Sequence, residues 1–381
     1  MEKKEILEIY RKVGGRIETK GKVELKTRED FALFYTPGVG AVSTHLSEHP
    51  EDARAFSIKG NSVAVISDGS AVLGLGNIGP YGALPVMEGK ALIFKQLAGI
   101  DAWPIVLNTQ DTEEIIRTVL AIAPGFGGIN LEDIAAPACF EIERRLIEKL
   151  DIPVMHDDQH GTAIVVLAGL INALKVVGKD MNTCWIVVNG VGAAGSAVMR
   201  LLKRYAPRVN ILAVDSEGII WRGRDTLNAE KRGLIEDGVI FAEDGGDLAK
   251  ALIDADVFIG VSKAGALSGV HMQKMKSGPI IFALANPVPE IFPDEARAAG
   301  AAVVATGRSD FPNQINNALV FPGVFRGALD GAVRRITDDM KIAAAQALAA
   351  LVATPSAEQI IPEVLDERVV AVVAQAVRES A

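Results

Sequence analysis

Cysteine is nearly absent from this sequence of 381 residues. Cys139 and Cys184 are the only two, and they lie far apart. They can build neither a disulfide framework nor a cysteine-ligated zinc site within one chain. The N-terminal segment MEKKEILEIYRK mixes charges with apolar residues at helical spacing and has no apolar core of an export signal. We therefore expect a protein of the reducing cytoplasm.

Positive charge and long hydrophobic runs are also lacking. Asp and Glu number 48 against 39 Lys and Arg, a formal net charge of −9, which argues against nucleic-acid binding. Aromatic residues make up 5% and hydrophobic residues 49%, as in ordinary soluble proteins. The longest apolar segment without a charge, 161–174, is too short to span a bilayer and predicts a buried core helix. We expect a small-molecule substrate, with neither nucleic acid nor membrane as partner.

Short β-branched segments alternate with helical patterns from residue 62 onward, which is typical of parallel α/β architecture. The expected strands are SVAVIS, PIVLN, FGGIN, IPVM, CWIVVN, VNILAVD, DVFIG, PIIFALA and AAVVAT, and helices are expected near 84–98, 111–122, 137–149, 160–177 and 193–204. After about residue 320 the chain is Ala-rich and helical, with breaks at Pro355 and Pro362. The predicted fold is an N-terminal α/β domain (1–158), a Rossmann-type nucleotide-binding domain (159–330) and C-terminal helices (331–381).

A dinucleotide fingerprint carries the strongest functional signal. The motif GVGAAG follows an apolar strand and precedes an amphipathic helix, which is the context that a Rossmann GxGxxG requires. Its residues are Gly190, Val191, Gly192, Ala193, Ala194 and Gly195. The first glycine permits a tight turn, the second lets backbone amides approach a pyrophosphate, and the helix N-terminus offers free N–H groups. The sequence therefore predicts an NAD(P) site.

The next strand bears on the choice between NAD and NADP. It ends at Asp215, whose carboxylate can accept hydrogen bonds from an adenosine ribose. Glu217 follows, and its negative charge should repel the extra phosphate of NADP. Arg222 and Arg224 lie close enough in sequence to favour that phosphate. We expect NAD, with NADP as an open alternative.

A second GxGxxG is formed by Gly74, Gly76 and Gly79. No strand ending in an acid follows it at the distance of a Rossmann unit. The loop still lies between a strand and a helix, where glycine-rich backbone can approach an anion. We therefore predict an active-site loop, not a second nucleotide site.

Two acidic pairs stand where strands end: Glu132 with Asp133, and Asp157 with Asp158. Ligands of open α/β sheets bind beyond the carboxyl ends of strands. Carboxylates gathered there repel one another unless a cation joins them, and oxygen ligands select Mg²⁺ or Mn²⁺. The alternative is that each pair only charges the first turn of a helix.

Two further residues suit acid–base work. Lys90 interrupts the apolar stripe of the helix near 84–98, and a lysine in an apolar setting has a lowered pKa and can act as a base. The alternative is a buried stem whose ammonium group reaches water. Tyr35 precedes Thr36, the expected N-cap, and Pro37, the expected first helical residue. A residue before the N-cap usually packs onto the fourth helical residue, but here that residue is Gly40, which has no side chain. The phenol of Tyr35 would be a suitable weak acid.

Asparagines also cluster near strand ends and loops. Asn286 closes the strand PIIFALA, and Asn313, Asn316 and Asn317 lie in the loop FPNQINNALVFPG. Their amides can orient a carboxylate or a carboxamide without adding charge. Each can equally be a turn former beside proline.

The motifs YTPGVG, SDGSAVLGLGNIGPYGALPVMEGK, GGINLEDI, HDDQHGTA, VNGVGAAG and FALANPVPEI together resemble a malic enzyme of the short microbial type, from about residue 10 to 330. The resemblance implies divalent-metal-dependent oxidative decarboxylation of L-malate to pyruvate and CO₂ with reduction of NAD(P). It also implies a homodimer, in which N-terminal helices complete the partner's site.

The resemblance assigns roles to individual residues. It implies that Tyr35 is the general acid, Lys90 the general base, Glu132, Asp133 and Asp158 the metal ligands, Asp157 their orienting neighbour, and Asn286 and Asn317 contacts of substrate or cofactor. The larger malic enzymes have an Arg after the DG motif, whereas this chain has Ser70 and Ala71. Other groups must therefore recognise the substrate carboxylate.

Three other functions remain open on the sequence. A zinc hydrolase would use His156 and His160, which have HExxH spacing but are expected to lie on a strand end and a helix rather than on one helix. An NAD-binding sensor would keep the glycine loop but need neither Lys90 nor the acids. A malolactic enzyme would use similar groups and release lactate.

Overall fold

The computed structural model describes residues 2–381, and its first half is built on a four-stranded parallel sheet. The strand order is β2-β1-β3-β4, with β1 Ser62–Ser67, β2 Asp101–Val106, β3 Gly128–Leu131 and β4 Val154–His156. Helices α5 Gly79–Ala98, α6 Thr112–Ile122 and α7 Ala138–Lys149 connect the strands. Because all four strands are parallel, their carboxyl ends meet at one edge of the sheet.

The second half carries a six-stranded sheet of order β10-β9-β8-β5-β6-β7. Its strands are β5 Trp185–Asn189, β6 Asn210–Asp215, β7 Gly218–Ile219, β8 Val257–Gly260, β9 Ile280–Ala283 and β10 Val303–Thr306, all parallel except β7. Its helices are α9 Ala193–Tyr205, α10 Ala229–Glu236, α11 Leu248–Ala251, α12 Gly269–Met272 and α13 Pro293–Ala298. The strand order reverses at β5, between β6 and β8, which is where such sheets bind dinucleotides. The predicted α/β fold is confirmed.

Helix α8, Asp157–Val177, connects the two sheets and packs against α9 and the C-terminal helix α15. It begins at Asp157, three residues before the start expected from sequence, because both aspartates belong to its first turn. It is long and apolar enough to cross a membrane, but 67% of its apolar window is buried inside the protein. It is therefore a core helix, as the sequence predicts.

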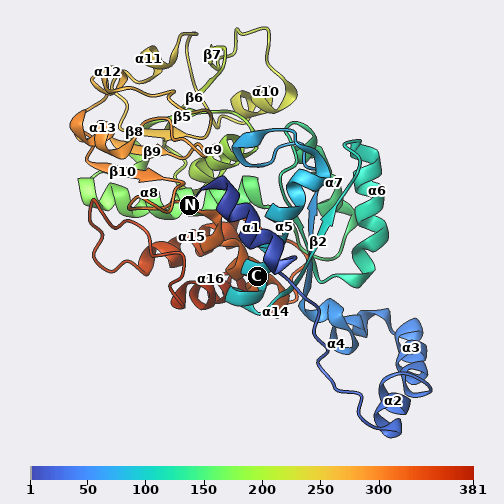
Figure 1. Cartoon of the computed structure of the whole chain (residues 1–381). Coiled ribbons are helices and arrows are strands. Elements are labelled where there is room, and N and C mark those ends of the chain that lie inside the picture. The colour runs from blue at the N-terminus through green and yellow to red at the C-terminus, as the bar shows by residue number, and fades with distance from the viewer. Residues whose placement is uncertain (1) are drawn as a thin grey trace.

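The C-terminal helices α14 Phe321–Asp330, α15 Asp338–Ala350 and α16 Arg368–Glu379 form a layer beside α5 and α8 (Figure 1). Phe94 of α5 packs edge-on against Phe321 and Phe325 of α14, with ring centroids 4.8 and 5.5 Å apart. Pro355 and Pro362 both fall between α15 and α16, as expected. Short 3₁₀ turns complete the fold: η1 Pro50–Asp52, η2 Ile58–Asn61, η3 Leu73–Leu75, η4 Ala123–Gly125, η5 Met181–Thr183 and η6 Asn317–Leu319.

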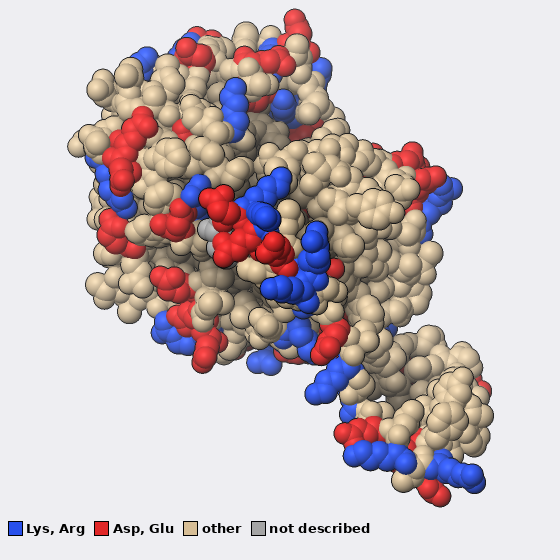
Figure 2. Space-filling model, viewed as in Figure 1, with Lys and Arg blue, Asp and Glu red and all other residues tan. Residues whose placement is uncertain are grey.

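An N-terminal arm projects from this body (Figure 1). Helix α1, Lys3–Val13, lies near α5, whereas α2 Arg28–Phe34, α3 Gly38–Glu48 and α4 Ala53–Phe56 extend away. Helix α3 begins at Gly38 after Pro37 in the N-cap position, so the expectation that Thr36 caps this helix is wrong. The arm exposes the apolar side chains of Phe31, Leu33, Phe34, Tyr35 and Val39. Figure 2 shows a broad uncharged face there.

Candidate active site

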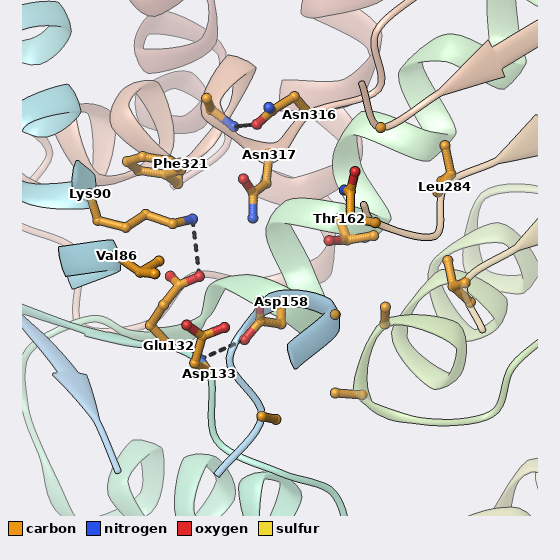
Figure 3. Close-up of a pocket in the computed structure, with 18 of the residues that line it drawn as sticks. Val86, Lys90, Glu132, Asp133, Asp158, Thr162, Leu284, Asn316, Asn317 and Phe321 are labelled. Carbon is orange, nitrogen blue, oxygen red and sulfur yellow. Dashed lines mark hydrogen bonds and ion pairs between the residues drawn. The ribbon is translucent and has the colours of Figure 1, made fainter. Parts of the chain in front are cut away.

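Three carboxylates converge at the carboxyl edge of the first sheet. Leu131 of β3 pairs with His156 of β4, so the residues that follow these strands emerge side by side. One oxygen each from Glu132, Asp133 and Asp158 lies within 4.8 Å of the others (Figure 3). The backbone N–H of Asp133 donates to Asp158 Oδ2 at 2.8 Å. An all-oxygen donor set of this kind fits a hard divalent cation such as Mg²⁺ or Mn²⁺.

Lys90 lies against this cluster from α5. Its Nζ donates to Asp157 Oδ2 and lies 3.1 Å from Glu132 Oε1 and 4.3 Å from the centre of the Phe321 ring. Burial alone would lower the pKa of Lys90, but the carboxylates of Asp157, Glu132 and Asp158 raise it above its usual value. The side chains around Lys90 therefore contradict the expectation of a lowered pKa. The alternative of an ammonium group directed to water is wrong too, because Nζ is held by the buried carboxylates of Asp157 and Glu132.

Asp157 is fully buried at the start of α8, so it is not a first-turn acid facing solvent. Its carboxylate holds Lys90, and it is not part of the three-carboxylate group. Gly161, one turn later, makes room for it, since a Cβ there would lie 1.9 Å from Asp157 Oδ1. Burial raises the pKa of Glu132, as do the nearby carboxylates of Asp158, Asp157 and Asp133, against the lowering effect of Lys90. This is the crowding that a divalent cation relieves.

Ser70 and Ala71 hold the loop that carries Asp133. The Ser70 hydroxyl donates to Asp68 Oδ1 at 2.6 Å and accepts the N–H of Ala135 at 2.8 Å. The N–H of Ala71 donates to the carbonyl of Asp133 at 2.9 Å. Asp133 has a positive φ of 55°, and these bonds support that unusual backbone. The Ser70 hydroxyl therefore has a structural role beside the carboxylate cluster, whereas Ala71 contributes only its backbone.

The glycine loop has the close contacts that the fingerprint predicts. Gly190 has a φ of 117°, and a Cβ on Gly195 would lie 1.8 Å from the carbonyl of Gly190. Gly192, Ala193 and Ala194 line a cavity at the start of α9. Val191 packs against the core.

That cavity has a volume of about 810 Å³ and also contains Lys90, Glu132, Asp133 and Asp158. The second glycine motif belongs to it through Gly74, where a Cβ would lie 1.9 Å from the carbonyl of Asn286. One cavity thus joins the carboxylates, both glycine loops and the nucleotide-binding edge of the second sheet.

The asparagines divide into two groups. Asn286 and Asn317 both line the cavity, and Asn317 points toward the space between Lys90 and Asp158 (Figure 3). Asn316 lines it too and accepts the N–H of Ala318, so it caps η6. Asn313 stabilises the loop. Its Nδ2 donates to the carbonyls of Val304 and Ala357, and its Oδ1 accepts the N–H of Ile360.

Sequence reasoning missed several lining residues. Thr162 lies one turn after Asp158 on α8, and Phe321 faces Lys90 from α14. Arg16 and Tyr10 also line the cavity, and Arg16 donates to the Tyr10 hydroxyl at 3.3 Å and to the carbonyl of Pro85. The HGTA motif could have indicated Thr162, but nothing local indicates that the N-terminal segment reaches this cavity.

Tyr35 and Asp215 are expected site residues that do not line this cavity. Tyr35 is 59% exposed on the projecting arm, and among the described residues it does not line its own chain's cavity. Asp215 lies beside the glycine loop, since the N–H of Gly190 donates to the carbonyl of Val214 at 2.8 Å. Burial would raise the pKa of Asp215, but hydrogen bonds from Arg224 and Lys231 lower it to about 2.

The histidine alternative lacks geometric support. His156 is the last residue of β4 and lies on no helix with His160. The ring of His160 contacts Glu143 at 3.0 Å. The single group of three possible metal ligands found within residues 2–381 contains carboxylates only.

Comparison with known proteins identifies the family of this chain. The family model for the malic enzyme N-terminal domain matches residues 14–147, and that for the malic enzyme NAD binding domain matches residues 159–381. This chain belongs to the malic enzyme family. It is similar to the bifunctional malic/malolactic enzyme of Bacillus subtilis, with 51% identity over 100% of this chain and 93% of that one. The NAD-dependent malic enzyme of Geobacillus stearothermophilus is 54% identical over 97% of this chain and 77% of that one.

Solved malic enzyme structures agree as well. The crystal structure of the NAD-dependent malic enzyme of Thermotoga maritima matches with a TM-score of 0.94 and 49% identity, covering 98% of this chain and 99% of that one. The malic enzyme fold and its NAD-binding Rossmann domain are therefore those of this chain.

Proposed function

We propose that this chain catalyses the divalent-metal-dependent oxidative decarboxylation of L-malate to pyruvate and CO₂ with reduction of NAD(P). One observation carries the proposal: the carboxylates Glu132, Asp133 and Asp158 share a cavity with the Lys90–Asp157 pair and the dinucleotide loop. A sensor that only binds NAD would need neither the buried lysine nor the carboxylates.

Each group of the cavity has a place in this chemistry. Glu132, Asp133 and Asp158 would hold the cation, which would polarise the C2 oxygen of malate and stabilise the negative charge that remains when CO₂ leaves. Its charge would also offset the carboxylates that raise the pKa of Lys90. Lys90 takes the C2 hydroxyl proton on Nζ, while Asp157 and Glu132 fix the direction of that amine. Asn286 and Asn317 would orient the substrate and the nicotinamide ring of a bound cofactor, which would supply the hydride acceptor.

The acid that protonates C3 is assigned to Tyr35 of a second copy. The arm that carries Tyr35 is apolar and exposed, and an exposed apolar surface of this kind marks an interface. We propose a homodimer in which the arm of one subunit completes the cavity of its partner. Each active site then combines Lys90 of one chain with Tyr35 of the other.

Mixed dimers test this arrangement. Tyr35→Phe and Lys90→Met are prepared separately, unfolded or dissociated together, and reassembled. If the arm acts on the partner, half of the dimers are hybrids with one intact site, and about a quarter of the wild-type activity returns. If Tyr35 acts within its own chain, every site lacks one group and mixing restores nothing. Sedimentation velocity of the unmixed protein reports the dimer, and a monomer would contradict the proposal.

The reaction itself is tested by spectrophotometry with L-malate and Mn²⁺. NAD and NADP are compared, pyruvate and lactate are quantified, and EDTA serves as the control. Reduced cofactor that matches pyruvate one for one and disappears with EDTA supports the proposal. Lactate without net reduction would favour a malolactic enzyme, a second candidate supported by the name of the Bacillus subtilis relative. No turnover with either cofactor would overturn both.

A further inference from the structure

A carboxylate is buried at the carboxyl ends of β8 and β9. It belongs to Glu290, which lies in the segment after β9 and is 0% exposed. Its Oε1 accepts the N–H of Ser262 at 3.0 Å, and its Oε2 accepts the N–H of Ala285 at 3.0 Å. Both donors are backbone groups, and hydrogen bonds from N–H groups to a buried carboxylate are strong. Burial raises the pKa of Glu290, against the lowering effect of these N–H groups.

Each oxygen of this carboxylate is bound to a different loop. Ser262 belongs to the loop after β8, and Ala285 belongs to the loop after β9. Gly260, the last residue of β8, leaves the space that the side chain fills, since a Cβ there would lie 2.4 Å from Glu290 Cδ. The Ser262 hydroxyl also accepts Asn189 Nδ2 at 3.0 Å, at the end of β5. Directly or through Ser262, one buried side chain therefore connects the ends of three neighbouring strands.

The loops that Glu290 connects form one wall of the active-site cavity. The residues of these loops that line it are Val261, Ser262, Leu284, Ala285 and Asn286. The glycine loop after β5 and the end of β6 belong to the adenosine half of a Rossmann crevice, so the nicotinamide half lies over β8 and β9. Glu290 is buried behind this wall, so it can act on a cofactor only through the loops.

We propose that Glu290 is a positioning residue for the nicotinamide half of the cofactor, because it fixes the loops after β8 and β9 relative to each other before the cofactor binds. If one of its two hydrogen bonds is lost, a buried N–H group lacks a partner, and the loops must be ordered at the expense of binding. The adenosine and pyrophosphate groups meet the glycine loop and β6 instead, so their binding does not depend on Glu290. The inference rests on the proposed use of NAD(P) and adds the residue that shapes the nicotinamide end of the cavity.

Two ligands separate this role from a general effect on folding. NADH carries a nicotinamide ring that ADP-ribose lacks, and the two are otherwise alike. The full chain and its Glu290→Gln variant are titrated with each ligand by calorimetry, and with NADPH and 2′-phospho-ADP-ribose in parallel. The amide of Gln keeps one acceptor but turns an N–H donor toward a backbone N–H. We therefore expect about tenfold weaker binding of the reduced dinucleotide, with ADP-ribose binding within about twofold of wild type.

Gly260→Ala provides a second variant, because its Cβ would displace the Glu290 carboxylate from beneath the loops. We expect the same selective loss, and the double variant should lose no more than the more severe single variant, since both substitutions act on one side chain. Gly260→Ala decides the test if Glu290→Gln does not fold. Glu243→Gln is the matched control, since Glu243 is an exposed glutamate of the same domain.

The ratio of the two affinities decides the outcome. Unchanged binding of the reduced dinucleotide in the Glu290 and Gly260 variants would overturn the inference. An equal loss of affinity for the dinucleotide and for ADP-ribose would overturn it too, because that result reports only a less stable domain. A selective loss in a protein that does not turn over malate would support the inference and contradict the proposed function. Failure of the wild-type protein to bind either dinucleotide would overturn both.

Discussion

Asp157→Asn is the substitution that best tests the central ion pair. It is nearly isosteric, and it removes the charge of a carboxylate that is 0% exposed and bound to a lysine that is 8% exposed. Loss of one partner of a buried pair typically costs about 3–5 kcal/mol. Lys90 keeps Glu132 at 3.1 Å, and repulsion between Asp157 and Asp158 disappears. Because both effects reduce the cost, we expect Asp157→Asn to lower the free energy of unfolding by about 3 kcal/mol, the lower end of that range.

Urea unfolding in EDTA measures this loss, with fluorescence and circular dichroism followed in parallel to establish a single transition. A double-mutant cycle with Lys90→Met isolates the pair, and we expect a coupling energy of about 2 kcal/mol. Glu148→Gln is the control, because Glu148 pairs with Arg144 at 2.7 Å on an exposed helix surface. Its loss should change stability by less than about 0.5 kcal/mol. A change in the free energy of unfolding of less than about 0.5 kcal/mol for Asp157→Asn, with no coupling energy to Lys90, would refute the reasoning.

Three further predictions concern the loop, the start of α8 and the arm. Gly195→Ala places a Cβ 1.8 Å from the Gly190 carbonyl and should weaken NADH binding by about tenfold or more in a fluorescence titration, whereas Gly125→Ala, in open space, should not. Burial would raise the pKa of Glu143, but His160 lowers it to about 2. The ionised carboxylate therefore stabilises the fold fully at pH values above 4.5, its ordinary pKa, and this stabilisation is lost as the pH falls toward 2. Glu143→Gln should therefore be less stable at pH 7 and lose less stability between pH 4.5 and 2, measured by urea unfolding across that range. Tyr35→Phe should retain oxaloacetate reduction better than pyruvate formation, and equal loss of both activities would count against Tyr35 as the acid.

Local patterns were sufficient for the sheets because buried parallel strands are short apolar segments. Each strand expected from sequence is present, including the one that leads into the glycine loop. The sequence pattern places the start of α8 three residues too late, because an acidic pair that follows a strand looks like the end of that strand. Acidic residues also favour the first turn of a helix. Asp157 and Asp158 follow a strand directly and also form the first turn of α8.

The partners of charged residues could not be predicted in the same way. The apolar stripe identifies Lys90, but Asp157, the carboxylate that raises the Lys90 pKa most, lies 67 positions away, and Glu132 and Asp158 add to its effect. Asp215 was identified from its strand, yet Arg224 and Lys231 occupy its oxygens. These outcomes depend on tertiary contacts, which the spacing of residues along a single element does not encode.

The distance between the two halves of the site depends on helix α8, most of whose apolar side chains lie in the core and not in the cavity. Asp158 lies in the first turn of α8, while α9 begins immediately after Gly192 of the dinucleotide loop. Because α8 and α9 pack against each other along a shared core, that packing fixes where the carboxylates lie relative to the nicotinamide-binding edge. We therefore expect buried residues such as Val166 and Leu170 on α8 and Val198 on α9 to influence the geometry of the proposed hydride transfer, since a shift of about 1 Å in the reacting groups can cost about a hundredfold in rate.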